Sequence, residues 1–137
     1  MPETQPVRTE TEGRWPTPEA AYALAPSITS EITWVAYTAR DFGHLTSPRE
    51  YWLRKAAVFD RIALTEQQRT LTVAGSADSD ADTAADDTAR RLLTIDHTGG
   101  LGPSGYANGP YPPNHPDSTH NPRGYIRQEY ALWVSNQ

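Results

Sequence analysis

The chain has 137 residues, of which 36% are hydrophobic, and its formal net charge is −5. This size suits one domain with one core, and the negative charge makes a nucleic-acid partner unfavourable. Because the sequence contains no cysteine, disulfide bonds, thiolate metal ligands and a cysteine nucleophile are excluded.

Residues 1–16 are polar and rich in Pro, Glu and Thr. They can bury too little apolar surface to offset the entropy lost on ordering, so we predict a disordered tail here and a single helical domain over 17–137. Trp15 is the one aromatic side chain of this tail and a candidate anchor. The start of the chain has no apolar leader, and no window approaches the roughly 18 apolar residues of a membrane span. We therefore expect a soluble, cytoplasmic protein without a membrane partner.

Two helices are predicted in the first third of the chain. Thr17 as N-cap, Pro18 at the first helical position and Pro26 as terminator predict a short one. Over 28–44, apolar residues recur at helical spacing, on one face. A strand is the alternative there, because the segment ITWVAYT is rich in β-branched and aromatic residues. Such a strand would carry apolar side chains on both faces and has no comparable partner strand, so a helix is favoured.

The segment 47–66 is predicted to form the central helix. Ser47 as N-cap, Pro48 at the first position and Glu50 two residues later form a capping box. Glu50 is also spaced to pair with Arg54 on the solvent side. The side chains expected to face the core are Trp52, Leu53, Ala56, Val58, Phe59, Ile62 and Ala63.

Two further helices complete a mostly α fold. One is predicted over 82–96, with acids in its first turns and arginines after them, so that Asp86 and Asp87 would pair with Arg90 and Arg91. Its core stripe is Ala85, Ala89, Leu92 and Leu93. The last is predicted over 122–134, with Asn121 as N-cap, Pro122 at the first position and a stripe of Ile126, Tyr130 and Trp133. Together these segments predict a small three- to four-helix bundle.

Residues 97–121 are too rich in Gly and Pro to continue a helix, so we predict a long irregular loop before the last helix. Three histidines and an aspartate in it could converge on a metal ion: His97, His115, Asp117 and His120. The alternative is that they are ordinary loop residues, because the PDST segment between two of them is a turn that the metal itself would have to order.

The sequence Ile95-Asp96-His97, followed by Asn108 or Asn114 and then His120, resembles the spacing of the His-Asn-His nucleases. That resemblance implies a metal-dependent nuclease or other hydrolase that uses the loop 96–120. The chain departs from the family in two ways. The segment ADDTARRLLTID indicates a helix where the family has strands, and the loop lacks basic residues that would hold DNA.

No other motif indicates an enzyme or a cofactor. No Gly-x-Ser-x-Gly elbow is present, and the glycine-rich GGLGPSG is interrupted by Pro103 and does not open a helix. Aromatic residues are typical interface anchors, and the candidates are Trp15, Tyr106 and Tyr111, with Trp34 or Tyr37 on the less buried side of the helix predicted over 28–44. Each could instead pack on the protein's own helices. We therefore expect a small non-enzymatic accessory or regulatory protein that acts by binding another protein. The metal-dependent enzyme is the alternative, and homo-oligomerisation is left open.

Overall fold

The computed structural model describes residues 15–41, 48–72, 80–99 and 110–137, and within these ranges it contains six helices and no strand. The mostly α fold is therefore confirmed. The helices are α2 (Pro18–Ala21), α3 (Ile28–Ala39), α4 (Pro48–Thr72), α5 (Asp80–Gly99), α6 (Pro116–His120) and α7 (Pro122–Ser135).

Local side-chain chemistry determines where α2 and α7 begin. The Thr17 hydroxyl accepts a hydrogen bond from the Ala20 N–H at 3.1 Å, as expected of the N-cap of α2. Asn121 caps α7 in the same way, at 3.0 Å from the Gly124 N–H. Both predicted caps are confirmed, whereas Ser47, the predicted cap of α4, lies outside the described residues.

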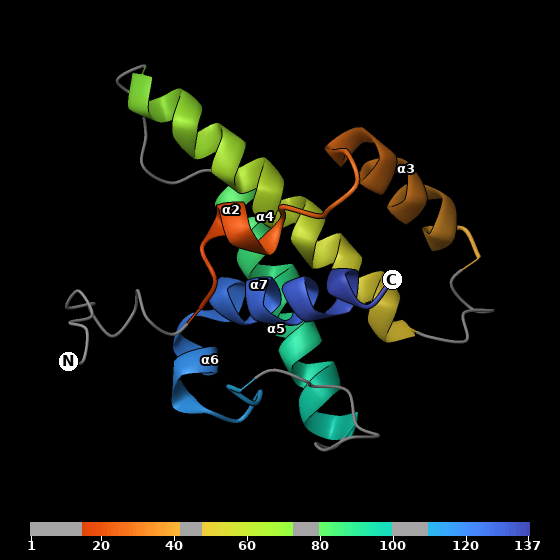
Figure 1. Ribbon diagram of the computed structural model, residues 1–137, viewed down its shortest axis with the longest axis vertical. Coiled ribbons are helices and arrows are strands. Elements are labelled where there is room, and N and C mark those ends of the chain that lie inside the picture. Colours follow the sequence, from red (N-terminus) through yellow and green to blue (C-terminus); the bar gives the residue numbers. More distant parts are fainter. Residues whose placement is uncertain (1–14, 42–47, 73–79, 100–109) are drawn as a thin grey trace, which may run out of the picture.

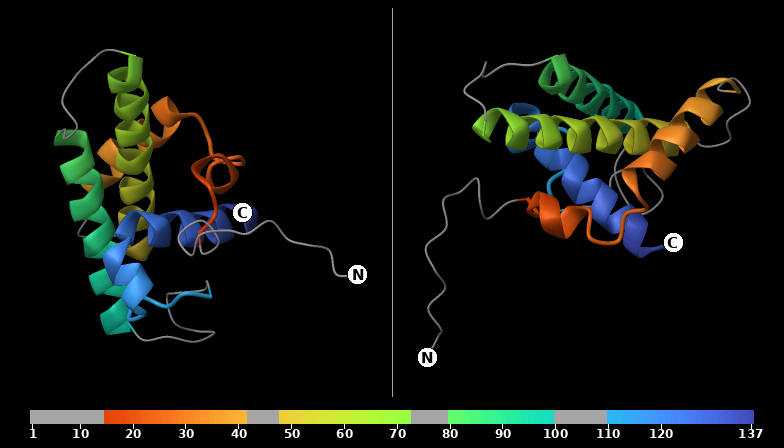
Figure 2. Two further views of the ribbon diagram at one scale, coloured as in Figure 1. Left: turned by 90° about the vertical axis from the view of Figure 1, so that its left-hand side faces the viewer. Right: turned by 90° about the horizontal axis from the view of Figure 1, so that it is seen from above.

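Helices α4 and α5 run antiparallel and side by side, and α7 lies across both of them (Figure 1 and the left view of Figure 2). Helix α2 packs on α7, and the link that follows it leads to α3 at the side of the bundle. The main neighbour of α3 is α4. As a result, α7 is the helix that connects the others, while α3 is the most peripheral of the longer helices.

The core lies where α4, α5 and α7 meet. Its buried members are Trp15, Leu53, Ala56, Ala57, Ala89, Leu92, Leu93, Tyr125, Ile126 and Tyr130. The predicted stripe of α5 is confirmed, because Ala85, Ala89, Leu92 and Leu93 are all buried. Trp15 belongs to this core although it was placed in the predicted tail, of which residues 1–14 lie outside the described part of the chain.

Several predicted boundaries were wrong. Helix α3 ends at Ala39 instead of 44, and α4 continues to Thr72 because residues 66–72 include good helix formers. Helix α5 continues to Gly99, and residues 116–120 form α6, so part of the predicted loop 97–121 is helical. Residues 100–109 of that loop lie outside the described residues.

Across the described ranges, no helix combines the length and the apolar character that spanning a membrane would require.

Candidate functional site

Three buried carboxylates hold the helices together, and each of them accepts hydrogen bonds from arginine and from a tyrosine hydroxyl. They come from three different helices. The groups are Glu31 of α3 with Arg54 and Tyr130, Asp60 of α4 with Arg123, Arg127 and Tyr22, and Asp96 of α5 with Arg49 and Tyr125. Arginine suits this task because its fork of donors can bind both carboxylate oxygens.

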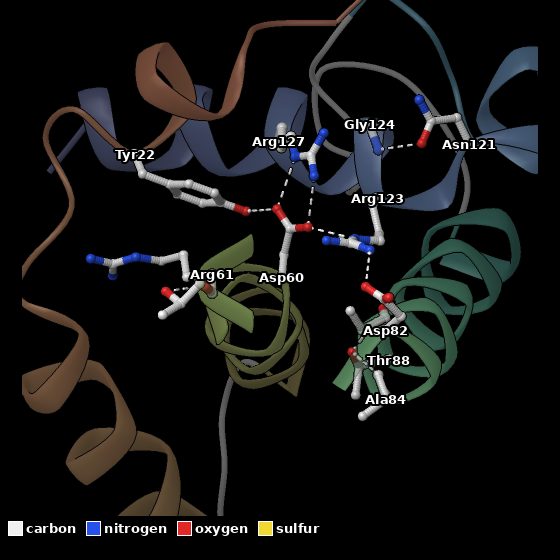
Figure 3. Close-up of polar contacts among 12 residues, drawn as sticks. Tyr22, Asp60, Arg61, Asp82, Ala84, Thr88, Asn121, Arg123, Gly124 and Arg127 are labelled. Atoms are coloured by element: carbon white, nitrogen blue, oxygen red, sulfur yellow. Dashed lines mark hydrogen bonds and ion pairs between the residues drawn. The ribbon is translucent and has the colours of Figure 1, made fainter. Parts of the chain in front are cut away.

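Asp60 lies between α2, α4 and α7 and is fully buried (Figure 3). Arg127 binds both of its oxygens at 2.8 Å, Arg123 donates to Oδ1 at 2.6 Å, and the Tyr22 hydroxyl donates to Oδ2 at 2.6 Å. Burial alone raises the pKa of Asp60, but the hydrogen bonds and charge of Arg127, with those from Tyr22 and Arg123, outweigh it, so the pKa is lowered. Arg123 also reaches Asp82 on α5 at 3.1 Å, so one guanidinium joins three helices.

Asp96 links α5 to α4 and α7. Arg49 donates to its two oxygens at 2.7 and 2.9 Å, and the Tyr125 hydroxyl donates at 2.5 Å. Burial, followed by the charge of Asp96, raises the pKa of Tyr125 far above its usual value, so the hydroxyl stays a donor. Arg49 also donates to Glu129 at 2.8 Å, and Gln128 donates to the same carboxylate at 2.8 Å.

Glu31 anchors α3 to the bundle. Arg54 donates to its two oxygens at 2.6 and 3.2 Å, and the Tyr130 hydroxyl lies 3.4 Å from Oε1. Burial and the charge of Glu31 raise the pKa of Tyr130 to about 12, which keeps this hydroxyl protonated at neutral pH. The guanidinium of Arg54 lies over the ring of Trp34 at 3.7 Å and that of Trp133 at 5.1 Å. Arg54 also forms the predicted pair with Glu50, but its side chain is only 13% exposed, so it does not face solvent as predicted.

The chemistry of these groups is structural. In the described residues, every buried side-chain nitrogen or oxygen has a hydrogen-bond partner. The pKa of Asp60 is lowered, so this carboxylate has little tendency to take a proton from a substrate. These networks therefore stabilise the arrangement of the helices. A functional contact is expected on the exposed surface instead.

The exposed large apolar side chains come from one segment of the described chain. Leu24, Ile32 and Tyr37 are the three large apolar residues that stand exposed among the described residues, with exposed fractions of 67%, 43% and 72%. All three lie on α3 or the link before it. The two fully buried residues of α3 are polar, Glu31 and Thr38, and they share the buried face of the helix with the half-buried Trp34 and Val35. Ile32, which the sequence pattern placed in the core, faces outward.

A groove follows this exposed part of α3. Ile28 and Ile32 of α3 form one wall, and Ile62 of α4 forms the other, with polar residues at the rim. A second hollow lies beside it, between α2 and α4, and the two share Arg61 and Thr65. We call the residues Leu24, Ile28, Ile32, Tyr37 and Ile62 the α3 surface.

The predicted interaction residues Trp15 and Tyr111 lie elsewhere. Trp15 is buried, with its ring edge-on to Tyr111 at 5.1 Å, and Tyr111 is half-buried, its backbone bound to the Gln128 side chain. Both rings face the protein's own core, which is the alternative that the sequence left open. Tyr106 lies outside the described residues. A contact of these residues with a partner stays a prediction.

The four predicted metal ligands do not gather in the structure. Among the described residues, no three His, Asp or Glu side chains are grouped to hold a metal ion. His115 is the N-cap of α6, where its Nδ1 accepts a hydrogen bond from the Asp117 N–H at 3.0 Å. His97 lies on α5 and His120 ends α6, and both are exposed.

The predicted resemblance to His-Asn-His nucleases differs from the structure in one segment. Residues 80–99 form helix α5, whereas the family has strands there. Asn114 is exposed, and Asn108 lies outside the described residues.

Comparison of the chain with protein-family models, with curated proteins and with solved structures found no match. Function has therefore to be argued from the geometry of this chain alone.

Proposed function

We propose that this protein is a small accessory module that binds another protein through the α3 surface. The observation that carries the proposal is the packing of α3, which buries Glu31 and Thr38 and leaves Ile32 and Tyr37 exposed. Exposed apolar residues that are scattered singly need no explanation, but a group of them beside a groove is typical of a contact surface.

The anchoring of α3 supports the same proposal. The ion pair between Glu31 and Arg54 holds the helix in place from its buried face, where the ring of Trp34 also contacts Arg54. A surface that is held rigid before binding loses less conformational entropy when a partner arrives. Tyr37 and Ile32 are then free to supply the apolar contact, and tyrosine is enriched among residues that dominate interface energies.

The groove indicates how a partner would be seated. Its walls carry three isoleucines, Ile28, Ile32 and Ile62, and its charged rim residues already have partners: Arg61 donates to the Pro26 carbonyl at 3.0 Å, and Glu66 pairs with Arg69. An amphipathic helix that lays its apolar face in a groove is a common mode of recognition on such a surface.

The test is capture of the partner by variants that change only the α3 surface. The chain is tagged and used to capture proteins from its native host, as wild type and as Ile32→Asp and Tyr37→Asp. Asn114→Asp is the matched control, because it adds the same charge at an exposed position outside α3. Circular dichroism shows whether each variant remains helical.

We expect a protein that is captured by wild type and by Asn114→Asp and lost with both α3 variants, because a charge placed in an apolar contact is costly to bury. Capture that is equal for all four chains would contradict the proposal. The same outcome would follow if the partner contacted Trp15 or Tyr111, and a Tyr111→Ala variant would then identify that site.

A further inference from the structure

A second feature lies on the opposite part of the molecule, between α5 and the segment that contains α6. It is an open cleft with a volume of about 360 Å³, a size within the range of small-molecule sites. Arg90, Leu93, Thr94 and His97 of α5 form one side, and Pro113 and Thr119 form the other. Leu93 and Pro113 are buried and form an apolar floor, while Arg90 and His97 are exposed at the rim.

The charge of this cleft is opposite to that of the chain. The whole chain carries −5, and the first half of α5 is acidic, yet among the described residues that line the cleft the charged one is Arg90. The one acid of α5 after Asp87 is Asp96, which is fully buried and bound by Arg49. A cationic cleft in an acidic protein is favourable for an anion.

Arg90 is available to bind such an anion. The sequence predicts that it pairs with Asp86, but in the described part of the chain neither that pair nor the Asp87–Arg91 pair forms. Exposed pairs of this kind gain little free energy, so other contacts can displace them. Arg91 lies over the ring of Trp52 at 4.8 Å, whereas Arg90 lines the cleft.

The threonines of the cleft are already engaged as donors. The Thr94 hydroxyl donates to the Arg90 carbonyl and the Thr98 hydroxyl to the Thr94 carbonyl, each at 3.1 Å, and Thr119 donates to the His115 carbonyl at 3.5 Å. Among the described side chains of the cleft, the donors left to face a ligand are the guanidinium of Arg90 and the ring of His97.

We propose that this cleft binds a small organic carboxylate, with its head group on Arg90 and His97 and its hydrocarbon part on Leu93 and Pro113. The site is separate from the α3 surface, so it does not depend on the proposed function. A planar guanidinium binds a carboxylate through two parallel hydrogen bonds, and the apolar floor adds affinity for each buried methylene.

The test is a titration followed by the backbone amide signals of Thr94 and His97 in nuclear magnetic resonance spectra. The probes are acetate, hexanoate and inorganic phosphate, each added to wild type, Arg90→Gln and Arg91→Gln. Arg91→Gln is the matched control, because it removes the same charge from the adjacent residue, which faces Trp52. Both arginines are exposed, so neither variant should impair folding, and circular dichroism checks this.

Hexanoate should bind saturably and more tightly than acetate or phosphate. Arg90→Gln should weaken that binding about tenfold, the loss expected for one charge-assisted contact, and Arg91→Gln should change it less than about twofold. Three results would overturn the proposal: no saturable shift with hexanoate, equal binding in the two variants, or tighter binding of phosphate than of hexanoate.

Discussion

Asp60 shows how a single residue can control the stability of this molecule. It is fully buried, and three side chains from α2 and α7 donate hydrogen bonds to it. The sequence offered one signal that it lies inside: Asp60 stands four positions after Ala56 and three before Ala63, within an apolar stripe. The sequence could not name its partners, because Arg123 and Arg127 are more than sixty positions away.

Asp60→Asn should destabilise the protein by about 3–5 kcal/mol, the usual cost of leaving a buried charge without its partner. The cost arises because Arg123 and Arg127 stay charged and lose their acceptor. Urea denaturation at pH 7 measures the free energy of unfolding. Glu66→Gln is the control, because its pair with Arg69 is exposed, and it should cost less than about 0.5 kcal/mol. Equal losses in the two variants would contradict this prediction.

The lowered pKa of Asp60 also predicts how stability depends on pH. In the unfolded chain this carboxyl takes up its proton near pH 3.9, whereas in the folded protein it does so only at lower pH. The unfolded state therefore binds more protons in this window, so the stabilisation is complete above it and is lost as the pH falls through the folded pKa. The free energy of unfolding should fall less between pH 7 and pH 3 in Asp60→Asn than in wild type. An equal fall in the two proteins would show that Asp60 is not responsible.

Gly124 is a second residue whose role depends on a distant neighbour. Alanine is better than glycine in most helices by about 1 kcal/mol, but a Cβ at this position would lie 2.7 Å from two ring atoms of Trp15. Gly124→Ala should therefore destabilise the protein by about 1–3 kcal/mol. In a Trp15→Leu background the same change should lower the stability less. Thermal unfolding of wild type, the two single variants and the double variant would show this difference. A Gly124→Ala variant more stable than wild type would disprove the close contact.

Among the helices, the sequence correctly predicted those boundaries that are determined by contacts within one helical turn. Caps and first-turn prolines correctly predicted the starts of α2 and α7, because these contacts involve residues within one helical turn. The orientation of α3 was wrong for the opposite reason. Its apolar spacing predicted an inward Ile32, but the face that packs inward carries Glu31, which is held by Arg54, twenty-three positions away.

The attachment of α3 predicts a local difference in stability. Helix α7 packs against α2, α4, α5 and α6, whereas α4 is the main neighbour of α3. Amide hydrogens of α3 should therefore exchange with deuterium faster than those of α7, through openings that leave the rest folded. Glu31→Gln should increase exchange in α3 and leave α7 unchanged. Equal protection of the two helices in hydrogen-exchange measurements would contradict this picture.

At the scale of the whole molecule, the sequence predicted the class of fold and part of the core. Leu53, Leu92, Leu93, Ile126 and Tyr130 are buried as predicted, because apolar periodicity reports burial directly. The buried charges and the exposure of Ile32 were not foreseen. Charged residues are normally exposed, so a sequence pattern places them outside unless their partners are known.

The claim that α3 is held by a polar contact and leaves Ile32 exposed can be tested on two adjacent residues. The measurement is the free energy of unfolding of Glu31→Gln and Ile32→Ser, by urea denaturation at pH 7. Glu31→Gln should lose about 3 kcal/mol, because it breaks a buried ion pair. Ile32→Ser should lose no more than about 1 kcal/mol, because Ile32 is 43% exposed. The reverse order, with Ile32→Ser the more damaging, is the result of an ordinary amphipathic helix and would contradict the account.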